Sequence, residues 1–489
     1  MWNTILEIVD TPERRKVLIG VTSAQTLIQI SSLPIALSVP SIARYYESSL
    51  TDTTWIVIAY LITLGGFSMT MARLGDKLGH SRVFVSGIIV TTIGAGIVTL
   101  SQELWQIIAM RALTGIGAAM ILGNAHSLLA ATFKNDERGR AFAIPVMGAR
   151  FGSLIGLAIF GILLQFLSWK WVFLSFVPIG LISLFLTLPL LTFKTLSTPI
   201  TKARIDLVGG FLLALTVAVL LLSGNHLHAG EESFTSSDAI SYHLPMHALF
   251  IILLGLFIFT QTKIQNPLVD IKQFRRKYFS LALIANMIFH GSMMATMMLV
   301  PILVEQGFGR SPLWVTLVLF PNQLLGMSIP FIAGTFYDKY RWKFLRPGAL
   351  ILISTGFLLF GLVSMSVPFW VMPILLLPVG FGTSVFNTIN NATVMNSIPL
   401  KHRGFASGML ETTREAGHGL GATLSSATFA ILLPVTASLI STIERQPFIR
   451  EAFQTTVMMV VITMLGAAMI AYLHKDVDTN ISHKQFEAN

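Results

Sequence analysis

The chain of 489 residues contains no cysteine, and only 11% of its residues are charged. The lack of cysteine excludes disulfide bonds, thiol chemistry and thiolate metal sites. A soluble globular chain carries about 25% charged residues, because its water-facing surface needs polar groups. Hydrophobic residues instead make up 53% of this sequence, and the mean hydropathy is +0.73. We therefore expect a lipid bilayer to be the solvent of most of the chain.

Long apolar runs follow one another along the whole sequence. A membrane-spanning helix needs about 20 mostly apolar residues, and continuous rather than alternating runs exclude a membrane β-barrel. The first run is too long for a signal peptide and lacks a cleavage pattern, so we interpret it as an uncleaved span. The fourteen expected spans are 17–38, 53–73, 83–100, 105–131, 139–166, 171–192, 206–223, 247–263, 278–304, 312–336, 346–366, 369–397, 404–434 and 453–474.

Lysine and arginine are distributed unevenly among the expected loops. If the N-terminus is cytoplasmic, most of the 33 basic residues face the cytoplasm, as the positive-inside rule requires. Those expected outside are Arg44, Lys170, Arg310, Arg445 and Arg450, and those within spans are Arg111, Arg150 and Arg414. We therefore predict a plasma-membrane protein with both termini cytoplasmic. The net charge of +10 reflects this topology, so we expect no nucleic-acid partner.

The sequence repeats itself weakly. Residues 138–156, RGRAFAIPVMGARFGSLIG, align with residues 403–421, RGFASGMLETTREAGHGLG, and Asp76–Lys77 aligns with Asp338–Lys339. Two related parts around a central site are a recurring transporter plan. We expect a six-helix half over 1–192, two extra spans and their loops over 193–277, and a second six-helix half over 278–489.

Several segments carry a resemblance to a known family. The loop ARLGDKLGHSR, Ala72 to Arg82, resembles the cytoplasmic gating motif of the major facilitator superfamily, with Ala72 replacing the motif's first glycine. The stretch IIAMRALTGIGAAM around Arg111 resembles the family's arginine-containing fourth helix. The segments 205–224 and 266–274 resemble the seventh span of the fourteen-helix drug:proton antiporter branch and the approach to its second half.

The resemblance to this branch covers nearly the whole chain. It implies an all-α polytopic membrane protein of fourteen transmembrane helices, a monomer without a cofactor, that exports hydrophobic or amphiphilic small molecules by alternating access in exchange for protons. Two positions depart from the branch. Leu157 stands where its fifth-helix motif has proline, and Ser31 stands on or near the place of a first-helix aspartate. A uniporter and an exporter of anionic amphiphiles or lipids therefore remain alternatives.

The repeated aspartates are expected to act as a gate. The matching residues are Asp76, Lys77, Gly79, Arg82, Asp338 and Lys339. A carboxylate at such a loop can pair with basic groups or helix N-termini of a neighbouring helix. Such a pair would latch one conformation and release in the other. The alternative is an ordinary charged loop.

Charged residues within the expected spans are the most informative feature. Glu411, Arg414, Glu415 and His418 follow i, i+3, i+4 and i+7 spacing and so share one helix face. At 1.5 Å per residue, Glu415 lies roughly 18 Å beyond Arg403, near the bilayer centre, and the repeat puts Arg150 at the equivalent position.

Such groups are costly in lipid, so these five residues and Arg111 are candidates for transport and proton coupling. The competing interpretations are a permanent Glu–Arg network and, for Arg111, a tie between helices, neither with a transport role.

Other polar and small residues are candidates for the cavity or for helix packing. Polar groups that either line a cavity or bond between helices are Gln29, Ser31, His126, Asn286, His290, Asn322 and Asn390. Glycines expected to allow close helix packing are Gly148, Gly152, Gly156, Gly161, Gly417 and Gly421.

An enzyme and a sensor are the other function classes. The sequence contains no metalloprotease, nucleophile-elbow or phosphate-loop motif, and no stretch between spans is longer than a loop. The histidines and carboxylates between residues 224 and 247 lack the close ligand spacing of a metal site. We therefore predict neither catalysis nor a metal site.

Overall fold

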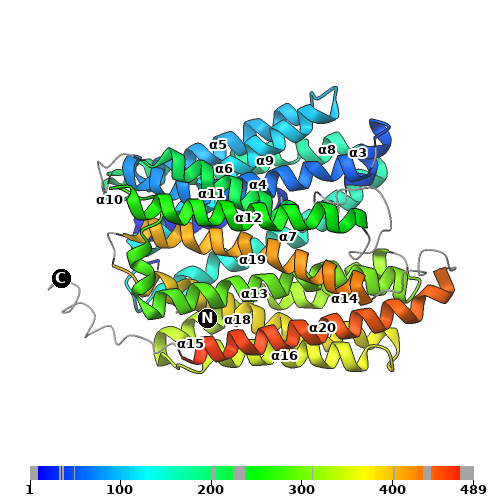
Figure 1. The fold of residues 1–489 in the computed structure, drawn as a ribbon. Helices are drawn as coiled ribbons and strands as arrows, with labels where there is room; N and C mark the ends of the chain where they lie inside the picture. Colours follow the sequence, from blue (N-terminus) through cyan, green and yellow to red (C-terminus); the bar gives the residue numbers. More distant parts are fainter. Residues whose placement is uncertain are drawn as a thin grey trace.

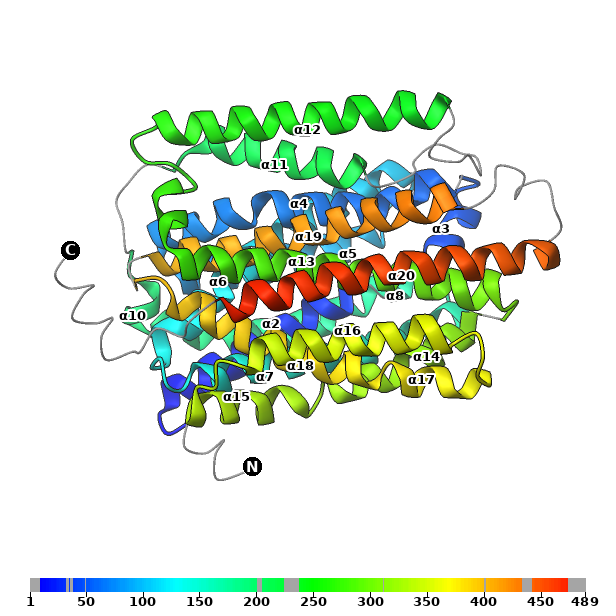
Figure 2. The ribbon, with the colours of Figure 1, turned by 60° about the horizontal axis from the view of Figure 1, so that its bottom comes forward.

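The computed structural model describes residues 9–31, 35, 38–48, 50–199, 205–223, 237–310, 312–399, 402–432 and 442–473. Long helices run roughly along one common direction in these parts of the chain (Figures 1 and 2). Leu157 and Gly161, the histidine-rich segment 224–236 and the predicted outer residue Arg445 lie outside the residues or side chains that are described.

The helices follow the expected apolar runs. Those before residue 277 are α2 (Pro12–Ser31), α3 (Val39–Tyr45), α4 (Leu50–Leu78), α5 (His80–Val98), α6 (Leu104–Thr132), α7 (Arg138–Phe166), α8 (Trp169–Leu174), α9 (Phe176–Thr187), η2 (Leu188–Thr192), α10 (Lys194–Ser197), α11 (Leu207–Ser223), α12 (Ser237–Lys263) and η3 (Ile271–Arg275). Those that follow are α13 (Lys277–Ile302), η4 (Leu303–Gly307), α14 (Pro312–Leu325), α15 (Ile329–Tyr340), α16 (Leu345–Val363), η5 (Phe369–Val371), α17 (Met372–Leu375), α18 (Leu377–Asn396), α19 (Arg403–Leu432) and α20 (Thr442–Tyr472).

Membrane-length helices dominate the described residues. Ten helical stretches there are long and apolar enough to cross a membrane, and α11 is apolar but only 17 residues long. The remaining long helices carry charged groups: α2 begins with Glu13, Arg14, Arg15 and Lys16, α7 contains Arg150, and α19 contains Glu411, Arg414 and Glu415. The protein is therefore an all-helical, multi-pass membrane protein.

Several predicted span limits were wrong because apolarity does not reveal where a helix breaks. In the first run, 17–38, α2 covers Pro12–Ser31, and Ile35 and Ser38, the described residues that follow it, lie outside any α-helix. The run 312–336 is divided into α14 and α15 by the turn 326–328, and a proline stands near the start of α15. Proline cannot donate a backbone hydrogen bond, so it favours such breaks.

Two helices contact both the early and the late parts of the chain. Helix α7 packs on α2 but also on α15 and α18, and α19 packs on α13 but also on α4 and α6. Helices α19 and α4 are in contact and Figure 2 shows them side by side, although they lie far apart in the sequence. The two repeated segments therefore begin the two helices that join the parts of the bundle.

Glycines allow these helices to approach closely. A Cβ atom added to Gly152 would lie 2.6 Å from the carbonyl oxygen of Thr26 on α2, and Gly148 accepts a hydrogen bond from Thr26 Oγ1 at 3.0 Å. On α19, added Cβ atoms at Gly417 and Gly421 would collide with the backbone of α13. Gly156 lies in α7. Any larger side chain at these crossings would force the helices apart.

Candidate functional site

A central cavity of about 270 Å³ lies between the two parts of the bundle. Helices α2, α4, α6 and α7 line it from one side, and α13, α14, α16, α18 and α19 line it from the other. Apolar side chains such as Phe289, Phe357 and Met293 form much of its wall, with polar groups between them. This is the composition of a small-molecule binding site, in which few polar groups orient a mostly apolar ligand.

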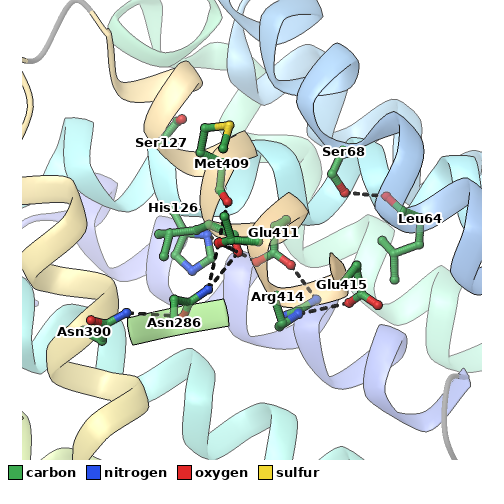
Figure 3. A network of polar contacts seen from close by, with 12 residues as sticks. Leu64, Ser68, His126, Ser127, Asn286, Asn390, Met409, Glu411, Arg414 and Glu415 are labelled. Carbon is green, nitrogen blue, oxygen red and sulfur yellow. Dashed lines mark hydrogen bonds and ion pairs between the residues drawn. The ribbon is translucent and has the colours of Figure 1, made fainter. Parts of the chain in front are cut away.

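Arg414 and two glutamates form an ion-pair network in the cavity wall (Figure 3). Arg414 Nη2 lies 2.5 Å from Glu411 Oε2, and Arg414 Nε lies 3.2 Å from Glu415 Oε1. His418 Nδ1 lies 3.3 Å from Glu415 Oε2. Both glutamates are only 2% exposed, whereas the Arg414 side chain is 23% exposed. One guanidinium is thus shared by two buried carboxylates, and its single positive charge balances only one of their two negative charges.

Histidines surround this network on other helices. His126 of α6 stacks on the Phe142 ring, and its Nδ1 lies 3.7 Å from Glu411 Oε1. The His290 ring of α13 lies 5.2 Å from the His418 ring. His126 and His290 also line the cavity. Three imidazole rings, that of His418 on α19 among them, therefore stand around the paired carboxylates.

Asn286 and Asn390 have different positions although both were cavity candidates. Asn286 lines the cavity and donates hydrogen bonds to Leu410 O at 3.1 Å and Thr413 Oγ1 at 3.0 Å. Asn390 is fully buried behind it, donates to Asn286 Oδ1 at 3.3 Å and accepts from Arg346 Nη2 at 2.8 Å (Figure 3). Asn390 therefore ties helices together and does not line the cavity.

The remaining cavity candidates also separate into two groups. Gln29, Asn322 and Arg150 line the cavity, and Arg150 Nη1 donates to Gln323 Oε1 at 2.8 Å. Ser31 points back to its own helix, with Oγ donating to Ile28 O at 3.0 Å. Arg111 is 2% exposed and lies outside the cavity lining.

Arg111 instead supports the cavity wall. Its Nε donates to Ile56 O at 3.1 Å, and its guanidinium lies 4.1 Å from the centre of the Tyr60 ring. Tyr60 lines the cavity. The cation–π contact therefore fixes the orientation of a cavity residue, which fits the helix-tie alternative better than direct contact with a ligand.

Asp338 joins the two parts of the bundle at one end. Its carboxylate accepts hydrogen bonds from the backbone N–H groups of Gly139 and Arg140, both at 2.9 Å, and from Arg140 Nε at 3.2 Å. Gly139 and Arg140 belong to the first turn of α7, whose free N–H groups and positive dipole end favour an anion. The Asp338 side chain is only 3% exposed. It thus holds α15 against α7.

Asp76 occupies a similar position against α19. A Cβ atom added to Gly404, in the first turn of α19, would lie 2.6 Å from Asp76 Cγ. Arg73 Nη1 lies 3.5 Å from Asp76 Oδ2, and His80 Nε2 lies 3.3 Å from Oδ1 without forming a hydrogen bond. Asp76 is 2% exposed. Gly404 gives the carboxylate room to reach the helix terminus.

The other predicted gating residues differ in burial. Gly79 precedes α5 with φ +100, and a Cβ there would also meet Ser197, so both conformation and space require glycine. Arg82 and Lys339 are exposed, and Lys77 is partly exposed. The aspartates and glycines therefore form the contacts between helices, whereas these basic side chains lie at the surface.

Sequence reasoning missed further residues at this end. Arg138 Nη1 donates to Asn396 Oδ1 at 2.6 Å, and its Nη2 donates to Ala130 O at 2.8 Å. His80 is buried and contacts Asn124 Oδ1 at 2.6 Å through Nδ1. The alignment of Arg138 with Arg403 was a usable signal for the first contact. No pattern in the sequence indicates the second.

The fold and the cavity together define a class of protein. Membrane-length helices surround a central cavity lined from both parts of the bundle, and buried charged residues stand in its wall. Such a cavity, closed by contacts at one end, is the arrangement of a membrane transporter.

The family follows from comparison with known proteins. Residues 19–422 match the family model of the Major Facilitator Superfamily, so the chain belongs to this superfamily of transporters. The riboflavin transporter RibZ of Clostridioides difficile (strain 630) is 25% identical over 394 residues, which are 80% of this chain and 83% of RibZ. MdtD of Escherichia fergusonii, named for multidrug resistance, is 24% identical over 447 residues, which are 91% of this chain and 92% of MdtD.

A solved structure supports the fold independently. The crystal structure of the human organic anion transporter MFSD10 (TETRAN) matches with a TM-score of 0.59 and 13% sequence identity. The match covers 94% of this chain and 100% of that chain. At this identity the likeness concerns the fold alone. The expectation of a membrane transporter rather than an enzyme is confirmed.

Proposed function

We propose that the protein exports hydrophobic or amphiphilic small molecules by alternating access and couples this export to proton entry. The observation that carries the proposal is the network of Glu411, Arg414 and Glu415 in the wall of a cavity between two parts of the bundle. Two carboxylates share a single guanidinium, so the three side chains together carry one excess negative charge. Uptake of one proton by either carboxylate would make the network neutral. RibZ and MdtD, whose names refer to small organic molecules, support a substrate of this size.

Coupling would act through the ion pairs. A proton on Glu411 or Glu415 removes that carboxylate's attraction for Arg414, which then pairs with the other carboxylate alone. Arg414 belongs to α19, the helix that contacts both α13 and α4. A change in the position of its side chain therefore acts at the surface along which the two parts would move.

We further propose fourteen spans, with α2, α7, α11 and α19 crossing the membrane beside the ten stretches that are long and apolar enough to span it. The termini would be cytoplasmic, the protein a monomer in the plasma membrane, and the two halves 1–192 and 278–489. The contacts of Asp338 with α7 and of Arg138 with Asn396 would then close the cytoplasmic end. The structure would correspond to a state that opens outward.

Proton flux in everted membrane vesicles tests the proposal. Respiration acidifies these vesicles, and a coupled exporter then releases protons when an amphiphile is added. We expect this release with at least one of ethidium, 2-naphthylacetate and its methyl ester, and we expect it to disappear in Glu411→Gln or Glu415→Gln. Glu451→Gln is the matched control, because Glu451 is exposed on α20.

The outcome separates the mechanisms. Amphiphile flux that ignores an uncoupler and both glutamine variants would contradict proton coupling and favour a uniporter. Lack of flux with every amphiphile in a correctly inserted protein would contradict the proposed substrate range.

A further inference from the structure

We propose that Arg150 binds an acidic group of the transported molecule, so that the substrates are amphiphilic organic anions. This inference rests on the proposed transport function and names the substrate class of the same cavity. It depends on a difference between the two arginines of the cavity wall, Arg150 and Arg414, in the partners of their guanidinium groups.

Arg150 places a cation at the cavity surface from the side opposite to α19. It belongs to α7, lines the cavity and is partly exposed. Its one hydrogen bond within the described residues goes from Nη1 to Gln323 Oε1 at 2.8 Å. The guanidinium carries five N–H donors, so donors remain for a ligand.

Charge compensation distinguishes the two arginines. Arg414 is neutralised by Glu411 and Glu415, which together leave that group with one excess negative charge. The Arg150 guanidinium donates to a neutral amide and has no carboxylate partner among the residues that the structure describes. A charge in the membrane interior is costly unless it is paired, and an acidic ligand group would supply the missing partner.

The position of Arg150 is fixed by a break in the opposite wall. A Cβ atom added to Gly326, in the turn between α14 and α15, would lie 2.6 Å from Arg150 Cγ and 2.8 Å from its Cδ. The arginine stem therefore lies across this glycine and reaches Gln323 at the end of α14. The side chain is held in one orientation before a ligand arrives, which reduces the entropy cost of binding.

The neighbouring wall suits the rest of such a molecule. Phe289, Met293, Met297 and Phe357 line the same cavity. Aromatic rings and methionine side chains accept flat apolar groups of varied shape. The cavity therefore combines a guanidinium that has no carboxylate partner among the described residues with an apolar surface, which matches an anionic head on an apolar body. A lipophilic cation placed beside Arg150 would gain the same apolar contacts but would be repelled by the guanidinium.

Binding of three matched probes tests this assignment independently of transport. Equilibrium dialysis against the full chain in lipid nanodiscs compares 2-naphthylacetate, its neutral methyl ester and 2-(2-naphthyl)ethylammonium. We expect the anion to bind roughly tenfold or more tightly than the ester, because charge-assisted hydrogen bonds reward only the anion. Arg150→Gln should remove this preference and leave ester binding unchanged, and Arg150→Lys should restore part of it.

Two further variants keep the test decisive. Gly326→Ala leaves every charge in place but displaces the Arg150 stem, so it should reduce the anion preference. Arg275→Gln removes an exposed charge outside the cavity and should have no effect. Equal affinities for the anion and the ester, or an anion preference that survives in Arg150→Gln, would overturn the inference. If proton-coupled flux of the ester is observed in that case, the proposed function still holds although the role of Arg150 does not. A preference for the anion without any flux would support the role of Arg150 and contradict the proposed function.

Discussion

Asp76 and Asp338 carry the same repeated Asp–Lys pair, yet the structure holds them differently. Asp338 accepts two backbone hydrogen bonds from the first turn of α7 and a third from Arg140. Asp76 touches Gly404 at the start of α19, but its Oδ1 has no hydrogen-bond partner in the described part of the chain. Hydrogen bonds to a charged group are stronger than neutral ones. If the two contacts act as the gate that the sequence predicts, the contact of Asp338 with α7 carries most of the free energy that holds this end closed.

The unequal latches suggest an order of opening. If the contact of Asp338 with α7 is the stronger one, its loss should open the end that we propose to be cytoplasmic, whereas loss of the Asp76 contact should only loosen that end. The chain contains no cysteine, so a single introduced cysteine reports on opening without background. Asn391 lines the cavity on α18. Labelling of Asn391→Cys from the cytoplasmic face by an impermeant maleimide therefore measures the open fraction.

Asp338→Asn should have the largest effect. The amide can accept from one N–H group, but its NH₂ would face the other donors, so at least one buried bond is lost. We expect a cost of about 2 kcal/mol to the closed state, which is roughly a 30-fold rise in labelling rate from the cytoplasmic side. An unchanged rate would show that this end is closed by other contacts.

Asp76→Asn should have a smaller effect. Arg73 lies 3.5 Å from the carboxylate and His80 contacts it without a hydrogen bond, so less is lost with the charge. We expect a cost of about 1 kcal/mol to the closed state, which corresponds to roughly a fivefold rise in the same labelling rate. An effect equal to that of Asp338→Asn would contradict the proposed inequality of the two latches.

Arg140→Gln distinguishes the contribution of the Arg140 side chain from that of the α7 N-terminus to the binding of Asp338. The two backbone N–H groups that bind Asp338 remain in this variant, whereas the hydrogen bond from Arg140 Nε to Asp338 is lost. Arg140 is partly exposed, so solvent weakens this ion pair. We expect a rise of about threefold or less in cysteine labelling. A larger rise would mean that the arginine, rather than the helix terminus, holds Asp338.

Much of this architecture could be predicted from the sequence. The apolar runs located the long helices, because lipid requires continuous apolarity. The spacing of Glu411, Arg414 and Glu415 indicated a shared helix face, since that property is local to one helix. The repeat indicated which aspartates to compare.

Contacts between distant helices were beyond such reasoning. No periodicity shows that Gly404 faces Asp76, that Gly326 lies under Arg150, or that Asn390 is buried behind Asn286. These depend on which helices pack together and at what depth. The break between α14 and α15 was missed for a related reason, because the turn 326–328 contains no charged residue that would interrupt the apolar run.

Lys339→Gln should have the smallest effect on the labelling rate. Lys339 follows Asp338 in the repeated pair, but its side chain is exposed and its Nζ lies 5.0 Å from the Tyr340 ring centre. An exposed charge of this kind contributes little to stability, because water and salt screen it. We expect cytoplasmic labelling of Asn391→Cys to stay within about twofold of the parent rate. A rise comparable to that of Asp338→Asn would instead assign Lys339 a direct part in closing the cytoplasmic end, and the latch would then depend on the whole charged loop rather than on one carboxylate at a helix terminus.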